Sequence, residues 1–412
     1  MSEMIKLRNL CTRITDGSHY SPLGVEKGYP MLSVKDMGSY DFNFDNCKYI
    51  SEDEYQSMLR NDCVPKKNDI VIAKDGSYLK EIFVITEDRD IAILSSIGIL
   101  RPNLALVDPY YLKYYLSSDY VRKLVGRKYV TGSALQRIIL ENFGDIDIPY
   151  VSLDRQHAIV ALLKDIDSKI ANNNAICFNL EAMAKLLYDY WFVQFDFPDE
   201  NGKPYKSSGG KMVWNEDLKR EIPEGWHAGA LGDVIEKYTN GISSSDIGDL
   251  PYTPMDILPM RQMSFSEIGS QEDANSSLIR YKKYSLLFGA MRPYFHRVCI
   301  APFDGITRTT VFTLRERGNG ELGYAFETLN QDYTVRYANA HHVGTQQPYA
   351  EWDDNLEKCP IPLPPVELRR KYSQMISDHI DDVIERNLEN QQLASLRDFL
   401  LPMLMNGQVK VG

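Results

Sequence analysis

Four short loops gather the basic, aromatic and amide side chains that suit contact with nucleic acid. Two are matched segments at 74–80 and 291–297, and two are matched segments at 131–137 and 344–347. Basic groups hold phosphates, Arg and Lys bond guanine edges, and Gln bonds adenine through two hydrogen bonds. The side chains that we predict to contact DNA are Lys74, Ser77, Tyr78, Lys80, Ser133, Gln136, Arg137, Arg292, Tyr294, His296, Arg297, Thr345, Gln346 and Gln347. Solvated hairpin tips and ordinary polar loops are the alternative explanation of this composition.

The rest of the sequence carries no pattern that indicates a reactive site. The string Asp108-Pro109-Tyr110-Tyr111 lacks the second proline of a nucleobase methyltransferase motif, and proline is expected at a helix start. A phosphate-binding G-x-x-x-x-G-K-[ST] loop is absent. His341 and His342 are adjacent, and sequence neighbours rarely converge on one metal ion unless a third ligand is supplied. Asp165 and Asp167 face different sides of a helix. The sequence therefore predicts a non-catalytic chain with no metal or cofactor of its own.

Charge is distributed unevenly, which bears on DNA binding. The net charge of −11 argues against contact with phosphates, because a DNA-binding surface is normally basic. Residues 120–140, however, hold five basic side chains and no acid, and residues 280–315 hold seven basic side chains and one acid. The N-terminus lacks a signal peptide, and no apolar run is long enough to span a membrane. We expect a cytoplasmic protein with two local basic regions.

The elements that position these loops are duplicated along the 412 residues. Residues 7–17 resemble residues 231–241 at an offset of 224, and Ile148-Pro149 matches Ile361-Pro362 at an offset of 213. The sequence predicts an α+β fold of two tandem α/β domains, each followed by a long helix. The predicted boundaries are residues 1–150 for the first domain, 151–197 for its helix, 198–226 for a linker, 227–364 for the second domain and 365–405 for the C-terminal helix.

Local patterns within the first domain predict its secondary structure. Ile70–Ala73 and residues 81–85 are typical of short strands on either side of a turn at Asp75-Gly76. Residues 110–125 are typical of one helix that ends at Gly126.

Both long helices carry a heptad pattern of apolar residues, which predicts that they pair as an antiparallel coiled coil. Each is long enough to act as a rod between the two domains. Asn173 and Asn387 interrupt the apolar pattern 214 residues apart, where a polar residue commonly sets helix register. Two exposed asparagines on unrelated helices remain the alternative. The residues that we expect in the helix pairing are Ile159, Leu163, Ile166, Ile170, Asn173, Leu180, Ile380, Ile384 and Asn387.

Taken together, these motifs resemble the specificity (S) subunits of Type I restriction–modification enzymes along nearly the whole chain. Both halves open on L-x-x-L/V followed by D/N-G, and T-G-S-x-x-Q stands at 131–136. I-P-x-x-x-L-x-x-Q stands at 148–156, and Y-W-F-V-Q-F-D at 190–196 is followed by I-P-E-G-W at 222–226. The motifs are specific as a set, although none is specific alone.

The resemblance implies two target recognition domains that each read half of a bipartite DNA site, and paired helices that set the unread spacer. It implies two methyltransferase (M) subunits that bring S-adenosylmethionine and methylate adenine at N6. It also implies restriction (R) subunits that use ATP with Mg²⁺. The second half departs from the pattern, because its loop at 343–347 is shorter and extra prolines precede its helix. Its contact residues are therefore less well defined.

Two other readings stay open. The chain could be the specificity subunit of a system whose nuclease and methylase are fused in one partner chain. It could also be a coiled-coil interaction protein with no role on DNA. The neighbouring reading frame separates the first of these from a Type I system, and charge reversal over 122–137 tests the second.

Overall fold

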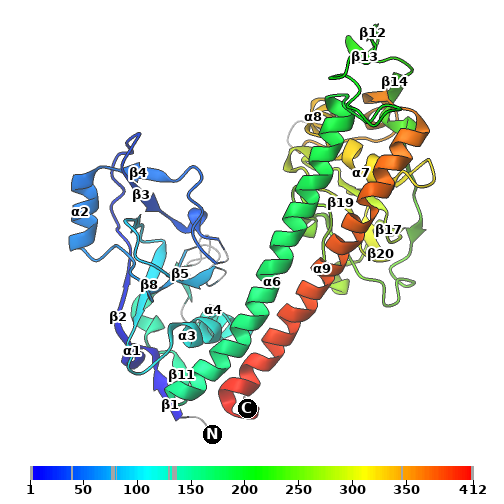
Figure 1. The fold of residues 1–412 in the computed structure, drawn as a ribbon. Helices are drawn as coiled ribbons and strands as arrows, with labels where there is room; N and C mark the ends of the chain where they lie inside the picture. The colour runs from blue at the N-terminus through cyan, green and yellow to red at the C-terminus, as the bar shows by residue number, and fades with distance from the viewer. Residues whose placement is uncertain are drawn as a thin grey trace. The chain divides into compact units, whose positions relative to one another are not determined.

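A computed structural model describes residues 3–38, 40–75, 79, 81–128, 130–131, 137–344 and 347–409 (Figure 1). The chain divides into two compact units. Unit 1 comprises Met1–Ser168 with Ala394–Gly412, and unit 2 comprises Lys169–Leu393. Each unit therefore combines one globular domain with parts of both long helices. No helix of the described residues is long and apolar enough to cross a membrane.

The central sheet of each unit has four antiparallel strands in the same order. In unit 1 the order is β2 (Cys11–Asp16), β8 (Ile97–Pro102), β5 (Ile70–Ala73) and β6 (Ile82–Val84). In unit 2 it is β15 (Ile235–Lys237), β21 (Val311–Glu316), β18 (Leu286–Gly289) and β19 (Val298–Ile300). All of β5, β6, β18 and β19 is buried, as expected for apolar strands at the centre of a core. The matching order confirms the predicted duplication and the two predicted strands around Asp75.

A second antiparallel pair joins the two ends of each domain beside its long helix. It consists of β1 (Glu3–Lys6) with β11 (Asp147–Tyr150) in unit 1, and of β14 (His227–Ala230) with β22 (Pro360–Leu363) in unit 2. Pro149 and Pro362, which lack an amide hydrogen, occupy equivalent places in these two-stranded ladders.

The domains differ in a third sheet, which explains why the sequence offset drifts early in each half. Unit 1 has β4 (Lys48–Ile50), β3 (Tyr29–Leu32) and β7 (Ala92–Ile93), with a parallel β3–β7 pair and helix α2 (Glu52–Arg60). Unit 2 has the antiparallel strands β16 (Gly241–Ile242), β17 (Leu278–Tyr281) and β20 (Gly305–Arg308). The remaining short elements are α1 (Leu7–Leu10), β9 (Val130–Thr131), β10 (Arg137–Ile138) and α5 (Leu140–Phe143), with helical turns at Val34–Asp36, Leu231–Asp233, Met255–Ile257, Gln271–Asp273, Pro293–Phe295 and Leu356–Lys358.

Two short helices follow the central sheet of each unit, and those of unit 2 begin 213 residues after their counterparts in unit 1. They are α3 (Pro109–Leu116) and α4 (Asp119–Lys128) in unit 1, and α7 (Leu322–Leu329) and α8 (Asp332–Ala340) in unit 2. The prediction of one helix over 110–125 is wrong, because the chain turns at Ser117 and Ser118. The Ser118 hydroxyl accepts a hydrogen bond from the amide of Val121 at 3.3 Å, which caps a new helix start.

The long helices are α6 (Leu153–Tyr188), which continues into a π-helical turn at Asp189–Val193, and α9 (Val366–Asn406). In unit 2 the Asn173 side chain bonds that of Asn390 at 2.9 Å, and the Tyr372 hydroxyl donates to the carbonyl of Ala184 at 2.8 Å. From Asn173 to Ala184 the residue numbers rise along α6, whereas those of their partners on α9 fall from 390 to 372. The two helices therefore run antiparallel (Figure 1). In unit 1 the start of α6 and the end of α9 share one apolar cluster, which includes Leu163 and Leu401.

Most of the residues that we expected to pair the helices are buried. Exposure is 9% or less at Ile159, Leu163, Ile166, Ile170, Asn173, Ile380 and Ile384. Leu180 and Asn387 are half-buried. Asn173 bonds Arg386, Glu389 and Asn390 at 3.1, 2.7 and 2.9 Å. Asn173 thus has polar partners that bracket Asn387 on α9, as suits a residue that fixes register.

The segment 198–226, which we expected to be a linker, is folded against unit 2. It contains a hairpin of β12 (Met212–Asn215) and β13 (Arg220–Pro223). Ile222 and Trp226 belong to the apolar core of unit 2, and Phe197 stacks on Trp226 with ring centroids 5.4 Å apart. The glycines and serines that suggested a linker form the turns between these anchors.

Candidate DNA-recognition surfaces

Unit 2 brings its two predicted recognition loops together. The loop 290–297 joins β18 to β19, and the amide of Arg292 donates to the carbonyl of Pro348 at 2.7 Å. Isolated bridges also pair Met291 with Tyr349 and Val343 with Tyr349. Segments about 50 residues apart in sequence therefore lie side by side and form one surface.

The side chains of the 290–297 loop separate into two groups. Arg292 and Tyr294 are exposed, and so is Gln347 on the adjoining segment. His296 is 3% exposed, and its Nε2 lies 2.8 Å from the side-chain oxygen of Asn330. Arg297 donates to the carbonyls of Asp256 and Leu258. We infer that His296 and Arg297 shape the loop and that Arg292, Tyr294 and Gln347 form its outer surface.

Backbone geometry supports this division. Arg292 and His296 have φ angles of 52° and 53°, in the left-handed region that residues other than glycine seldom adopt. Such conformations persist only where surrounding contacts hold them, and they cluster at functional loops. The buried His296 and the Arg292 amide bond supply those contacts. Thr345 and Gln346 lie outside the described residues.

Unit 1 repeats the convergence at its own loop pair. The amide of Ile138 donates to the carbonyl of Lys74 at 3.1 Å, which joins the β5–β6 connection to the segment after β9. The Lys74 side chain is 5% exposed and forms an ion pair with Asp16, so it braces the loop in this structure. Ser77, Tyr78, Lys80, Ser133 and Gln136 lie outside the described residues, as does the side chain of Arg137.

Unit 2 also has a groove with an excess of basic side chains, which the sequence did not predict as a site. It has a volume of about 830 Å³, and its lining includes Arg280, Lys282 and Lys283 together with Arg315, which is paired with Glu236 at 2.6 Å. The carboxylates of Asp304 and Glu316 also line it, so basic side chains are in excess but are not alone. Lys282 and Lys283 are exposed, and the Lys283 ammonium lies 4.7 Å from the centre of the Tyr284 ring. These side chains suit phosphate contact. The excess of basic residues over 280–315 is the sequence signal for this groove, but it does not by itself separate the groove from the loop at 291–297.

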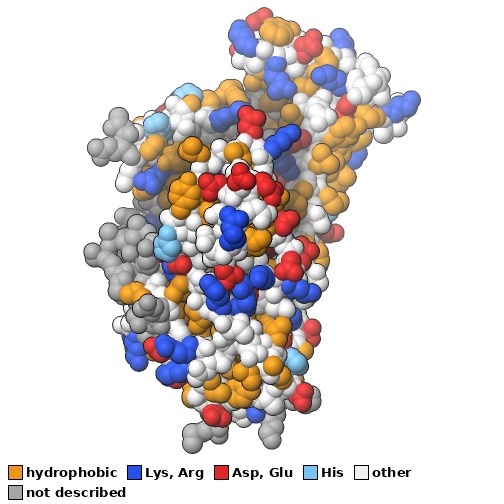
Figure 2. Space-filling model, turned by 90° about the vertical axis from the view of Figure 1, so that its left-hand side faces the viewer, with side chains coloured by type: hydrophobic (Ala, Val, Ile, Leu, Met, Phe, Trp, Pro, Cys, Tyr) orange, Lys and Arg blue, Asp and Glu red, His pale blue; other side chains and the backbone are white. Residues whose placement is uncertain are grey.

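The basic stretch of unit 1 lies on α4. Arg122, Lys123, Arg127 and Lys128 are all exposed there, whereas the matching helix α8 carries only Arg336. Basic, acidic and apolar side chains are interspersed over the face in Figure 2, so the negative total charge does not exclude local cationic patches. The two units therefore expose basic side chains on different elements.

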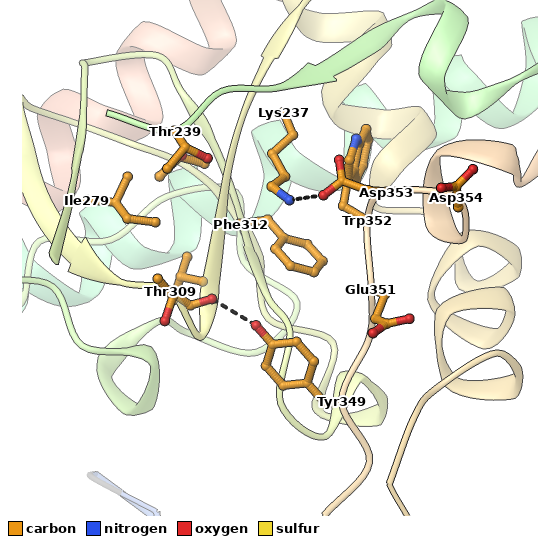
Figure 3. A pocket seen from close by; sticks show the side chains of 12 residues that line it. Lys237, Thr239, Ile279, Thr309, Phe312, Tyr349, Glu351, Trp352, Asp353 and Asp354 are labelled. Atoms are coloured by element: carbon orange, nitrogen blue, oxygen red, sulfur yellow. Dashed lines mark hydrogen bonds and ion pairs between the residues drawn. The ribbon is translucent and has the colours of Figure 1, made fainter. Parts of the chain in front are cut away.

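A pocket of about 530 Å³ lies beside the converging loops of unit 2 (Figure 3). The Tyr349 hydroxyl donates to the carbonyl of Thr309 at 2.8 Å, and Lys237 is paired with Asp353. Glu351 and Asp354 add further carboxylates to the lining. This lining disfavours phosphate, whereas carboxylates can accept from the amino group of cytosine. Among the described residues, no group of three His, Cys, Asp or Glu could hold a metal ion.

A repeated domain with convergent polar loops and nearby basic side chains, joined to antiparallel helices, defines a tandem DNA-recognition protein. Residues 18–182 match the family model described as the Type I restriction modification DNA specificity domain. The chain is similar to Type I restriction–modification specificity subunits, and this similarity indicates a role in DNA sequence recognition.

Relatives and a solved structure cover most of the chain. It is 24% identical over 315 residues to the MjaIX specificity subunit of Methanocaldococcus jannaschii, covering 73% of this chain and 68% of the relative. It is 18% identical over 409 residues to the HindI specificity subunit of Haemophilus influenzae, covering 84% and 87%. The S subunit of M. genitalium superposes with a TM-score of 0.55 at 15% identity, covering 98% and 96%, which shows a shared fold.

Proposed function

We propose that each unit reads one half of a bipartite DNA site and that the chain docks two copies of an adenine-N6 methyltransferase subunit. S-adenosylmethionine would be held by those subunits. ATP with Mg²⁺ would be used by restriction subunits where the system includes them. The chain's own part is to bind DNA and to position its partners.

Equivalent pockets, one in each unit, carry this proposal. The pocket of unit 1 has a volume of about 440 Å³, and its lining includes Tyr115, Asp119, Tyr120 and Pro149. The pocket of unit 2 has a volume of about 360 Å³, and its lining includes the residues 213 positions later, Thr328, Asp332, Tyr333 and Pro362.

The long helices complete the two pockets in the same way. In unit 1 the end of α9 contributes Leu401 and Met405. In unit 2 the end of α6 contributes Tyr188, and the π-helical turn that follows it contributes Phe192. Apolar pockets of this kind are typical places for a partner to anchor a side chain. A duplicated pocket is what two copies of one partner chain would require, since each copy could use the same contact.

Replacing Arg292 with alanine should weaken recognition at one half-site and leave the other unchanged. Loss of an arginine contact to a base edge costs about 1–3 kcal/mol, which corresponds to roughly 5- to 150-fold in affinity. The measurement is binding of the assembled complex to oligonucleotides that vary one half-site at a time. Lys219→Ala is the matched control, since it removes an exposed cation from the β12–β13 hairpin. Equal losses at both half-sites would contradict the assignment, and Gln136 and Arg137 permit the same test in unit 1.

The experiment that tests the whole proposal is genome-wide detection of methylated adenine in cells that express the chain with its neighbouring methyltransferase. We expect one bipartite motif that vanishes when this chain alone is deleted. Methylation that is unchanged by the deletion, or a continuous motif without a spacer, would overturn the proposal. The same data give the target sequence and the spacer length.

A further inference from the structure

One oxygen of a buried carboxylate in unit 2 lacks a hydrogen-bond partner among the described residues. Glu327 lies on α7, is 2% exposed, and its Oε2 atom has no hydrogen-bond partner in the described part of the chain. It lines a pocket of about 230 Å³, together with Glu181 and Lys185 of α6 and Arg261 of the loop that precedes β17. An isolated buried carboxylate is costly, so its retention calls for an explanation.

The equivalent position of unit 1 is closed by internal contacts. The residue 213 positions earlier is Tyr114, whose hydroxyl donates to Asp167 at 2.7 Å. Asp167 is also bonded to Lys113 and Arg397, at 3.3 and 2.9 Å. Unit 1 therefore satisfies its polar groups at this place, whereas in unit 2 the Oε2 atom of Glu327 has no hydrogen-bond partner among the described residues.

The cations near Glu327 are committed to other acids. Lys185 is paired with Asp189, and Arg261 is paired with Asp332 at 2.8 Å. Glu181 accepts a hydrogen bond only from the amide of Met263, at 3.0 Å, among the contacts described for it. Burial raises the pKa of Glu327 to about 8 and that of Glu181 to about 7. Both carboxylates would gain from an added cation.

The surface next to this pocket is apolar and open. Phe178, Met183 and Leu186 of α6 are 71%, 56% and 68% exposed, and Phe178 also lines the pocket. Exposed aromatic and aliphatic side chains on one helix mark a surface that another chain covers. Acid and apolar groups side by side are complementary to a segment that carries both apolar and basic side chains.

We propose that the Glu181–Glu327 pocket receives an arginine or lysine side chain of the methyltransferase subunit, while Phe178 and Leu186 pack against the same segment of that partner. The inference rests on the proposed function, because it requires a methyltransferase partner. It adds a further contact with that partner, beyond the duplicated pockets, and it places this further contact in unit 2 only.

A divalent cation fits the pocket less well than a basic side chain. Mg²⁺ and Ca²⁺ prefer six or more oxygen ligands, whereas Lys185 and Arg261 place positive charge beside the two carboxylates. A guanidinium group offers several donors in a plane and can stack on an aromatic ring such as Phe178.

The test measures binding of the full chain to the methyltransferase subunit encoded with it, by calorimetry without DNA. Glu327→Gln keeps the shape and removes the charge, and it should weaken binding roughly 10- to 100-fold. Glu181→Gln should weaken binding less. Glu272→Gln, which changes an exposed carboxylate outside the pocket, should bind as the unchanged chain does.

Proton release provides a second readout that a merely structural residue would not give. Glu327 faces Lys185, Asp189 and Glu181, and a bound cation should drive a proton from it near pH 7. The binding enthalpy of the unchanged chain should therefore depend on the ionisation enthalpy of the buffer, and this dependence should fall in Glu327→Gln.

The outcomes separate the inference from the proposed function. If the unchanged chain binds no methyltransferase subunit, the proposed function fails. If it binds and Glu327→Gln binds equally well, only the pocket inference fails. If millimolar Mg²⁺ alone raises the melting temperature of the unchanged chain but not that of Glu327→Gln, the pocket is a metal site and the inference is overturned.

Discussion

Replacing Asp167 with alanine should lower the melting temperature of unit 1 by roughly 6–20 °C. Asp167 is 9% exposed and accepts from Lys113, from the Tyr114 hydroxyl and from Arg397. Removing one partner of a buried ion pair costs about 3–5 kcal/mol, because the remaining charge stays buried without compensation. For a domain of this size, each kcal/mol shifts the melting temperature by roughly 2–4 °C.

The pH dependence of this contribution has a definite sign. Burial alone would raise the pKa of Asp167, but Lys113, the Tyr114 hydroxyl and Arg397 outweigh it and hold the pKa below its ordinary value. A carboxylate with a lowered folded pKa stabilises the protein above its unfolded pKa of about 3.9, and this stability is lost as pH falls through the folded value. The difference between the unchanged chain and Asp167→Ala should thus be full at neutral pH and shrink below about pH 4.

Asp165→Ala is the matched control, because Asp165 lies two residues away on the same helix and is exposed. Its melting temperature should stay close to that of the unchanged chain. Hydrogen exchange of α3 and of the end of α9 should increase in Asp167→Ala, since Lys113 and Arg397 lie on those elements. If Asp165→Ala and Asp167→Ala melt alike, the cluster does not hold unit 1 together.

The elements that the sequence predicts best are those whose pattern repeats. Ile159, Leu163, Ile380 and Ile384 are spaced for one face of a helix, and their burial follows from that spacing alone. The Ile-Pro pairs at 148 and 361 fix the offset at which both halves align, and β11 and β22 confirm it. The spacing of apolar residues and the duplication of segments are properties of the sequence itself, so both can be recognised from the sequence alone.

Contacts between distant residues could not be predicted in the same way. Lys74 was expected to face DNA but is paired with Asp16, and His296 is bonded to Asn330. A basic side chain in a loop has the same sequence signature whether it braces that loop or points outward. The choice depends on which acid or amide the fold brings within about 3 Å, the normal hydrogen-bond distance.

Surface sites that combine several elements were also missed. The basic groove combines Lys282 and Lys283, which follow β17, with Arg315 of β21. The acidic pocket forms only where α6 lies against α7. Glu327 looks like an ordinary helix residue in the sequence. Only burial in unit 2 and comparison with Tyr114 distinguish it.

The free chain should lose stability as pH rises from about 5 to 8, and Glu327→Gln should remove much of that loss. Burial raises the pKa of Glu327 to about 8, while the unfolded value is about 4.3. Between these values the folded chain keeps a proton that the unfolded chain has released. The folded state then binds more protons, so stability falls with increasing pH, by about 1.4 kcal/mol per pH unit where the slope is steepest.

Urea denaturation of the free chain at pH 5, 6, 7 and 8 measures this effect. The midpoint of Glu327→Gln should lie near that of the unchanged chain at pH 5 and clearly above it at pH 8. Glu181→Gln should act in the same direction over a narrower range, because burial raises the pKa of Glu181 only to about 7. Glu272→Gln should run parallel to the unchanged chain at every pH. Parallel behaviour of Glu327→Gln would instead mean that Glu327 is ionised and paired within the free chain, which removes the reason for it to seek a cation from a partner.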